Sequence, residues 1–289
     1  MVRGVAGLIV AVAALLGGLG PPAWACDLSP PEAATVAAVL DGETLKLADG
    51  RIVRLIGAKA PRPPLGWRGD DPWPLVDEAK NALSALAAAG KTVELRFGGL
   101  RQDRHRHFLA QVFVVEGENR LWLQEALVAK GLARVYSFSD NRACVADLLA
   151  REKEARAKRL GVWASYVYRI APALDVKRLG RLIHSYQLVE GTVVAVGEGG
   201  GRLYLNFTED WRSDFTVSVD RKNASAFAAA GIDLKALVGK RLRARGFLAW
   251  RNGPTIEATH PEQIELLPDN PHEENAKSPE RQTGPAIAL

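Results

Sequence analysis

The same order of secondary structure occurs twice along the chain, and this repeat limits the choice of fold more than any other feature. In the first half, strand and helix patterns alternate in the order strand, strand, strand, helix, strand, strand, at residues 34–40, 43–50, 51–57, 73–90, 92–97 and 108–117. We expect the helix to stop at Gly90, which is a good C-cap residue. Two further helical segments follow, at 122–131 and 141–163.

The second half repeats this order with a different sequence. Residues 187–207 predict two strands joined by a glycine-rich turn, and residues 214–220 predict a third. A helical segment at 223–239 precedes the closing strands within 240–267, which surround a turn at Asn252-Gly253. Three strands, a helix and two strands is the order of a five-stranded OB barrel. We therefore predict an α+β protein, mainly β, in which an OB barrel with three helices precedes a second OB-like barrel.

This order divides the chain into segments. We assign residues 26–168 to the first domain, 169–183 to a linker and 184–267 to the second domain. The segment 268–289 is rich in proline and charge, and we expect it to be disordered.

Residues 1–25 predict a secretory signal peptide. Arg3 precedes an apolar run at 5–20, and Ala23-Trp24-Ala25 provides an A-x-A cleavage site. The run is shorter than the roughly 20 residues that span a bilayer, so cleavage should leave no membrane span. We expect an exported protein, either periplasmic or secreted. Because Cys26 falls directly at the cleavage point, a lipid-anchored form is the alternative, which the bulky Trp24 disfavours.

Cys26 and Cys144 are the two cysteines of the chain. In an oxidising compartment an even number of cysteines indicates a bridge, and we expect these two to form a disulfide. Two separate buried thiols are the alternative.

The formal net charge of +5 permits an anionic partner, although a solvated basic surface explains it equally well.

Four motifs occur in order between residues 35 and 168: VLDGETLKLADGRIVRLIGAKAP, DRHRHFLAQVF, LQEALVAKGLARVY and EKEARAKRLGVW. In order and spacing this segment resembles the thermonuclease (staphylococcal-nuclease-like) family. The whole layout is similar to that of secreted bacterial members with an appended C-terminal domain. The resemblance implies hydrolysis of phosphodiester bonds in DNA and RNA, with Ca²⁺ held by two aspartates and a backbone carbonyl. Two arginines would steady the phosphate, and a glutamate would act on the attacking water.

The metal-binding part of this resemblance is incomplete. Glu43 stands at the first metal aspartate, with Asp41 two residues earlier, whereas Lys59 stands at the second and Ala60 at the residue that lends its carbonyl. An ammonium beside a Ca²⁺ site costs about 4 kcal/mol per unit charge at an effective dielectric constant near 20. We therefore expect no metal cofactor, unless the family reaction survives with Ca²⁺, and we expect Lys59 to pair with Glu43.

The catalytic part is also altered. Arg54 stands at the first phosphate-binding arginine, but Arg62 replaces the catalytic glutamate, and arginine cannot accept a proton at neutral pH. In the loop that begins at Asp103, Arg106 replaces a glycine and His107 replaces the second arginine. Whether the chain is an enzyme stays open at this point. Arg54, Arg106 and His107 are the candidate catalytic residues.

Cations without an activating base favour binding of an anion over its cleavage. In the first domain, the candidate contacts to nucleic acid are Arg54, Arg62 and Arg104. OB barrels bind single strands through basic grooves with stacking aromatics, and the second domain offers Trp211, Arg243 and Arg245. The alternative for the second domain is that its aromatics are core residues and its arginines simply alternate outward.

Three functions follow from these observations. The first is an exported, catalytically degenerate thermonuclease-like protein that binds nucleic acid or another polyanion. The second is an active nuclease with a remodelled, metal-independent site that uses His105 or His107. The third is an interaction scaffold in the cell envelope.

Overall fold

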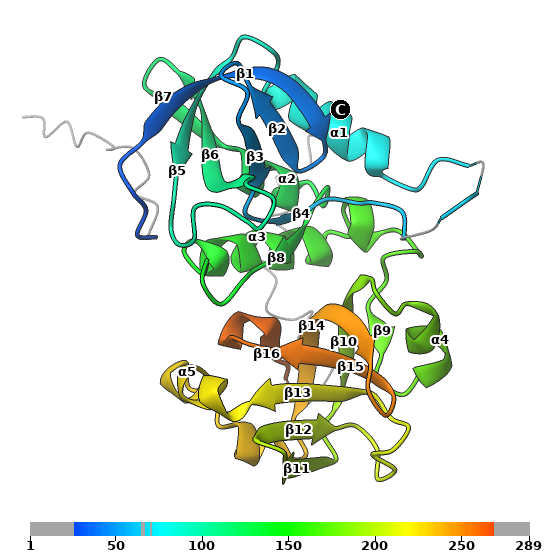
Figure 1. Ribbon diagram of the computed structural model, residues 1–289. Coiled ribbons are helices and arrows are strands. Elements are labelled where there is room, and N and C mark those ends of the chain that lie inside the picture. The colour runs from blue at the N-terminus through cyan, green and yellow to red at the C-terminus, as the bar shows by residue number, and fades with distance from the viewer. Residues whose placement is uncertain (1–25, 65–66, 70, 269–289) are drawn as a thin grey trace, which may run out of the picture.

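The computed structural model describes residues 26–64, 67–69 and 71–268, and it contains two β units stacked on each other (Figure 1). The predicted signal peptide at 1–25 and residues 269–289 of the tail, which we expect to be disordered, lie outside the described residues. Among the residues that are described, no helix is long and apolar enough to cross a membrane.

The first unit is a closed five-stranded barrel. Its strands follow the order β1-β2-β3-β6-β5 and back to β1, with one parallel pairing between β3 and β6. A short hairpin partner, β7 (Asn119–Trp122), extends β6. This is the OB arrangement that the sequence predicts. The bounds are β1 (Glu32–Asp41), β2 (Thr44–Leu47), β3 (Ile52–Leu55), β5 (Thr92–Arg96) and β6 (Phe108–Glu116).

Alternation along the strands directs apolar side chains into this barrel. On β3, Val53 and Leu55 are buried in the core, whereas Arg54 between them points out of it. Helix α1 (Val76–Leu86) packs against β1 and contributes Leu83 to the same core. The helix ends earlier than predicted, with Ala87 as its C-cap, because Gly90 instead takes a left-handed conformation in the turn into β5.

A second layer lies below the barrel. Helix α2 (Leu123–Ala129) packs on α3 (Val145–Ala157), and a two-stranded sheet pairs β4 (Gly57–Lys59) with β8 (Arg134–Tyr136). A 3₁₀ turn (Gly161–Trp163) follows α3, so the helical segment predicted at 141–163 is shorter. This layer faces the second unit (Figure 1).

The second unit is a curled sheet with the OB strand order. The path runs β11-β12-β13-β15-β14-β10, and only Val193 and Val194 separate β10 from β11 in the chain. Apart from the parallel β13–β15 pair, the pairings along this path are antiparallel. The bounds are β10 (Tyr186–Thr192), β11 (Ala195–Gly199), β12 (Arg202–Asn206), β13 (Thr216–Asp220), β14 (Arg241–Trp250), β15 (Pro254–Ala258) and β16 (Ile264–Leu266), which pairs with β14.

The helical segment of this unit is divided. Helix α5 (Ala224–Ala229) buries Phe227 in the core and is followed by a left-handed Gly231 and a 3₁₀ turn (Leu234–Leu237). The segment 169–183, which joins the two units, also contributes structure to the second. It contains β9 (Ala171–Pro172), which pairs with β10, and α4 (Val176–Arg181).

A buried polar interface connects the two units. The Nη1 of Arg245 on β14 donates to Glu152 Oε2 on α3 at 2.7 Å, and both side chains are almost fully buried. Glu152 Oε2 also accepts from the Val135 backbone N–H at 3.0 Å. Arg134 donates to the Tyr186 carbonyl at 3.0 Å. Arg245 and Glu152 thus balance each other's charge across the interface, whereas Arg134 is held by the Tyr186 carbonyl and by the faces of the Tyr168 and Tyr186 rings.

Further contacts surround this pair. Ser137 Oγ lies 2.7 Å from Nε2 of the buried His260, and Arg142 donates to both carboxylate oxygens of Glu262. Burial lowers the pKa of His260 to about 4, so its ring is neutral at pH 7. The interface therefore combines a hydrogen bond to a neutral histidine with ion pairs, and each of these contacts fixes how the two units pack.

The predicted disulfide is present between Cys26 and Cys144. It ties the start of the described chain to the N-cap of α3 across 118 residues. Replacing both cysteines with serine should lower the free energy of unfolding by about 2 to 4 kcal/mol, because the unfolded chain regains loop entropy. Urea unfolding of the variant and the unreduced parent measures this loss. An unchanged midpoint would contradict the prediction.

Candidate functional site

The candidate site is built around Glu43, in the turn between β1 and β2. The Glu43 backbone N–H donates to Asp41 Oδ1 at 2.8 Å, which fixes the turn. Gly42 is required between them, because a Cβ there would lie 2.9 Å from both the Ala60 and the Ala79 Cβ atoms. The turn therefore directs the Glu43 side chain inward, where it is 2% exposed.

Three cations converge on one oxygen of this carboxylate. Glu43 Oε1 accepts from Lys59 Nζ at 3.0 Å, from Arg54 Nη2 at 2.6 Å and from Arg62 Nη2 at 2.5 Å. Glu43 Oε2 accepts from the Ala60 backbone N–H at 2.7 Å. The predicted Lys59–Glu43 ion pair is confirmed. We call Glu43, Arg54, Lys59 and Arg62 the Glu43 cluster; its formal charges sum to two positive units.

Burial and charge act in opposite directions on the two buried members. Burial raises the pKa of Glu43, but Lys59, Arg62 and Arg54 outweigh it, so the pKa lies below its ordinary value and the carboxylate is ionised. Burial lowers the pKa of Lys59, and the attraction of Glu43 opposes that shift only in part. Arg54 and Arg62 differ from these two because their side chains are 34% and 50% exposed. They present the excess positive charge to solvent.

These residues do not fit a Ca²⁺ ion. Calcium requires several oxygen ligands, whereas the Glu43 cluster offers one carboxylate whose two oxygens already accept four donors. Asp41 directs one oxygen to the backbone of the turn. Within the described ranges, no group of three or more His, Cys, Asp and Glu side chains is placed to hold a metal ion.

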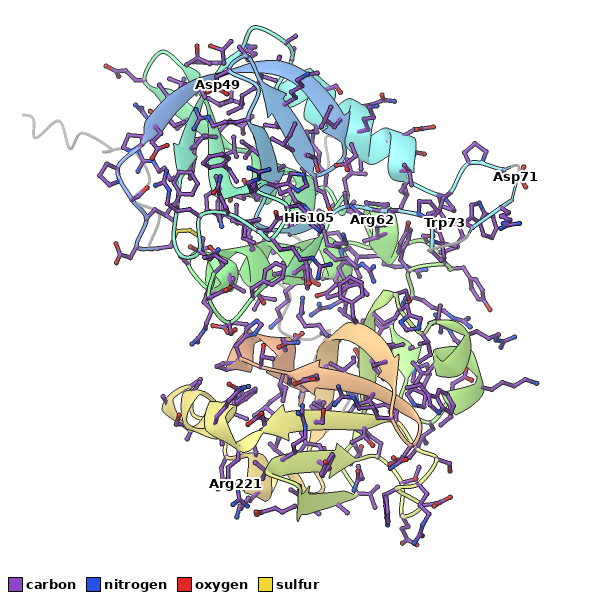
Figure 2. All side chains as sticks on the ribbon, viewed as in Figure 1. Asp49, Arg62, Asp71, Trp73, His105 and Arg221 are labelled. Atoms are coloured by element: carbon purple, nitrogen blue, oxygen red, sulfur yellow. A yellow bond between two sulfur atoms is a disulfide. The ribbon has the colours of Figure 1, made fainter. Side chains whose placement is uncertain are left out.

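The loop that contains the other candidate residues is organised by Asp103. Its Oδ1 accepts from the His105 and His107 backbone N–H groups, and its Oδ2 lies 3.1 Å from His107 Nδ1. Arg106 is left-handed, with φ of 64°, at the position where the family resemblance places a glycine. Figure 2 shows His105 and Arg62 at the same end of the first barrel. Among the described residues, no hydrogen bond or ion pair links this loop to the Glu43 cluster.

Arg104 and Trp211 lie apart from the Glu43 cluster. Arg104 is exposed on the same loop, where its Nε donates to His105 Nε2 at 3.1 Å. Trp211 is half-exposed on the second unit, between β12 and β13.

Arg243 and Arg245 do not lie on a surface. Both are about 98% buried, and they pair with carboxylates on β10, β16 and α3. Because they are buried, these two arginines are not available to contact nucleic acid, and the prediction that they do so is wrong. Alternation along β14 suggested one exposed face, but the first unit and β16 cover it.

Sequence reasoning missed an aromatic cluster next to the Glu43 cluster. Tyr136 lies 4.5 Å from Phe138, 5.0 Å from Tyr186 and 5.6 Å from Phe247 between ring centroids, so the cluster draws on both units. Burial raises the pKa of Tyr136, Arg54 lowers it by a smaller amount, and Glu43 raises it slightly further. Tyr136 lies on β8, which pairs with the strand that carries Lys59. Its position at the end of the motif LQEALVAKGLARVY was the one available signal.

Neutralising the central carboxylate should destabilise the first unit. In Glu43→Gln, Lys59 stays buried without a counter-ion, and we expect a loss of about 2 to 3 kcal/mol. This loss is at or below the lower end of the range for breaking a buried ion pair, about 3 to 5 kcal/mol. The reason is that the partly exposed Arg54 and Arg62 side chains can reorient toward solvent. Urea unfolding measures the loss, and Glu118→Gln in the exposed β6–β7 turn is the control. Equal effects of the two changes would contradict the role of Glu43.

The same group gives a pH dependence with a defined sign. The folded pKa of Glu43 lies below the ordinary value of 4.5, so its stabilisation is present above that pH and is lost as the pH falls below it. The Glu43→Gln variant should lack this part of the acid dependence.

One comparison with known proteins bears on this site. Residues 52–165 match the family model described as staphylococcal nuclease homologue. The match begins at β3 and ends beyond α3, so it includes Arg54, Lys59, Arg62 and the Asp103 loop but not Glu43 or the second unit. It supports the thermonuclease-like resemblance for this part of the chain, and with it a function related to nucleic acids. No curated protein matches the chain.

Proposed function

We propose that this protein is an exported, catalytically degenerate thermonuclease-like protein that binds nucleic acid or another polyanion. One observation carries the proposal: the carboxylate at the centre of the site is bound by three cations, two of which reach solvent. Arg54 keeps the first phosphate-binding position that the resemblance implies, whereas Lys59 and Arg62 replace the second metal aspartate and the general base.

The chemistry of the Glu43 cluster favours binding over cleavage. Exposed guanidinium groups pair with phosphate oxygens in a bidentate manner. Hydrolysis needs an activated water, and neither Arg62 nor Lys59 provides a base or a metal ligand at neutral pH. The neighbouring aromatic cluster adds surface on which bases can stack.

Export belongs to this proposal as well. A disulfide persists in an oxidising compartment, and the Cys26–Cys144 bridge supports such a location. The leader at residues 1–25 lies outside the described residues and stays a prediction.

Cleavage and binding assays on labelled single-stranded DNA, duplex DNA and RNA test the proposal. The chain from Cys26 onward should cleave none of them, with Ca²⁺ or with chelator. It should bind them with an affinity that falls as salt is raised, because binding releases counterions. Arg62→Gln should weaken binding and reduce the salt slope by about one.

Arg221→Gln is the matched control, since it removes the same charge from an exposed residue at the far end of the second unit (Figure 2). Chelator-resistant cleavage would instead favour an active, metal-independent nuclease that uses His105 or His107. An absence of nucleic-acid binding, together with salt-insensitive association with an envelope protein, would favour a scaffold.

A further inference from the structure

The second unit carries a pocket that the Glu43 cluster does not explain. Its volume is about 550 Å³, within the range of small-molecule sites. Its lining residues belong to β11, β12, β13 and β15 and to the loop at Trp211 and the turn at Asn252. Figure 1 shows β11 and β12 at the end of the second unit away from the first. The pocket lining includes Glu198, Tyr204, Asn206, Trp211, Ser218 and Arg251.

The aromatic part of this pocket is open to solvent, and the Arg212 guanidinium lies 4.6 Å from the centroid of the Trp211 ring. Trp211 is 49% exposed and belongs to neither hydrophobic core of the described chain. Tyr204 stands on β12 beside it, half-buried. A large ring at the mouth of a pocket indicates a surface that a ligand covers.

The polar part consists mainly of uncharged groups. The hydroxyls of Thr216 and Thr255 donate to neighbouring protein oxygens, and both retain lone pairs that can accept. The Ser218 hydroxyl is nearly fully buried on the pocket side of β13. The Asn206 side-chain nitrogen donates no hydrogen bond within the described part of the chain. The pocket thus offers both donors and acceptors.

The charged groups at the rim are already paired with each other. Arg251 lies 3.7 Å from Glu257, and Arg202 donates to the same carboxylate at 2.6 Å. Glu198 binds Arg221 and Lys235. A phosphodiester backbone needs a continuous track of available cations, and this rim instead alternates in sign.

We propose that this pocket binds an uncharged carbohydrate. The apolar face of a sugar ring would stack on Trp211 and Tyr204. Its hydroxyls would bond to the Asn206 amide and to the threonine and serine hydroxyls. In other proteins of this fold the face formed by the second and third strands binds oligosaccharides and also oligonucleotides. This analogy supports a ligand on this face, and the alternating charges of the rim favour the saccharide. The sequence predicts that Trp211 contacts nucleic acid, whereas the mainly uncharged lining and the alternating charges of the rim favour a sugar.

Titration calorimetry with cellotetraose, maltotetraose and chitotetraose tests the proposal on the chain from Cys26 onward. At least one should bind in a single-site isotherm. Trp211→Ala should weaken that binding about tenfold or more, because the apolar contact with the ring is lost. Asn206→Ala should weaken it as well.

Trp250→Ala is the matched control, because Trp250 is 59% exposed on the same unit but does not line the pocket. It should leave binding unchanged, and unaltered urea unfolding should show that each variant is folded. Oligothymidylate serves as the competing ligand. The proposal is overturned if no oligosaccharide binds at millimolar concentration, if Trp250→Ala weakens binding as much as Trp211→Ala, or if oligothymidylate binds in a Trp211-dependent manner and the saccharides do not.

Discussion

The combined variant Lys59→Asp and Arg62→Glu should bind Ca²⁺, which the parent should not. The two changes convert the formal charge around Glu43 from two positive to two negative units and supply further carboxylate oxygens next to it. Without metal, the clustered carboxylates repel one another and should lower the stability of the variant. Calcium should reverse this loss, by about 2.7 kcal/mol at a concentration of 100 times the Kd.

Thermal unfolding with and without Ca²⁺ measures this effect directly. Arg221→Glu with Lys222→Asp is the control, because it makes the same charge change at exposed positions in the second unit. Its unfolding temperature should not respond to Ca²⁺. Specific Ca²⁺ binding by the parent, or a folded Lys59→Asp and Arg62→Glu variant without affinity, would contradict our interpretation of the Glu43 cluster.

The Lys59→Asp and Arg62→Glu variant should gain nuclease activity when Ca²⁺ is bound. Arg54 is already in place to hold a phosphate, whereas His107 faces Asp103. Adding His107→Arg should therefore raise the rate further, by about 10² to 10³ if this position supplies a transition-state cation. Cleavage of single-stranded DNA with Ca²⁺ and with chelator is the measurement. Robust Ca²⁺-dependent cleavage by the parent, lost in Arg54→Ala, would show that the family reaction survives here.

Breaking the buried Arg245–Glu152 ion pair between the units should lower the free energy of unfolding more than the other substitutions do. Glu152→Gln leaves the guanidinium of Arg245 buried beside a neutral amide, and we expect a loss of about 3 to 5 kcal/mol. Burial lowers the pKa of Arg245, but Glu152 outweighs it and raises the pKa overall. Within the described chain, Arg245 Nε and Nη2 make no hydrogen bond. Glu152 is the carboxylate to which Nη1 donates, and Glu265 lies farther away, 3.6 Å from Nη2.

Urea unfolding of a double-mutant cycle measures this coupling. Arg245→Met and Glu152→Met should each be costly, and the double variant should cost much less than their sum, because it leaves no buried charge unpaired. Glu154→Gln, two residues away on α3 and paired with Arg151 at the surface, should change stability by less than about 0.5 kcal/mol. A loss below 1 kcal/mol in Glu152→Gln would show that the interface does not depend on this pair.

The sequence by itself determined the features that follow from local periodicity, from the family motifs and from the number of cysteines. On β3, the alternating pattern buries Val53 and Leu55 and turns Arg54 outward, and α1 has a helical period. Patterns of this kind, in the order strand, strand, strand, helix, strand, strand, were sufficient to predict the first OB barrel. The Lys59–Glu43 pair was predictable because a lone buried carboxylate needs a counter-ion and the motif supplied one. The disulfide was predicted from the presence of two cysteines and from the predicted export signal.

Only the tertiary structure decided what lies between and outside the barrels. The partners of the interface are far apart in sequence: Arg245 and Glu152 by 93 residues, and Ser137 and His260 by 123. The alternating pattern of β14 gives the direction of each side chain but not what covers it, so the burial of Arg243 and Arg245 could not be predicted. The pocket at Trp211 combines four strands, a loop and a turn, so it could not be predicted for the same reason. Local periodicity follows from the geometry of one strand or helix, whereas burial at an interface depends on how two units pack.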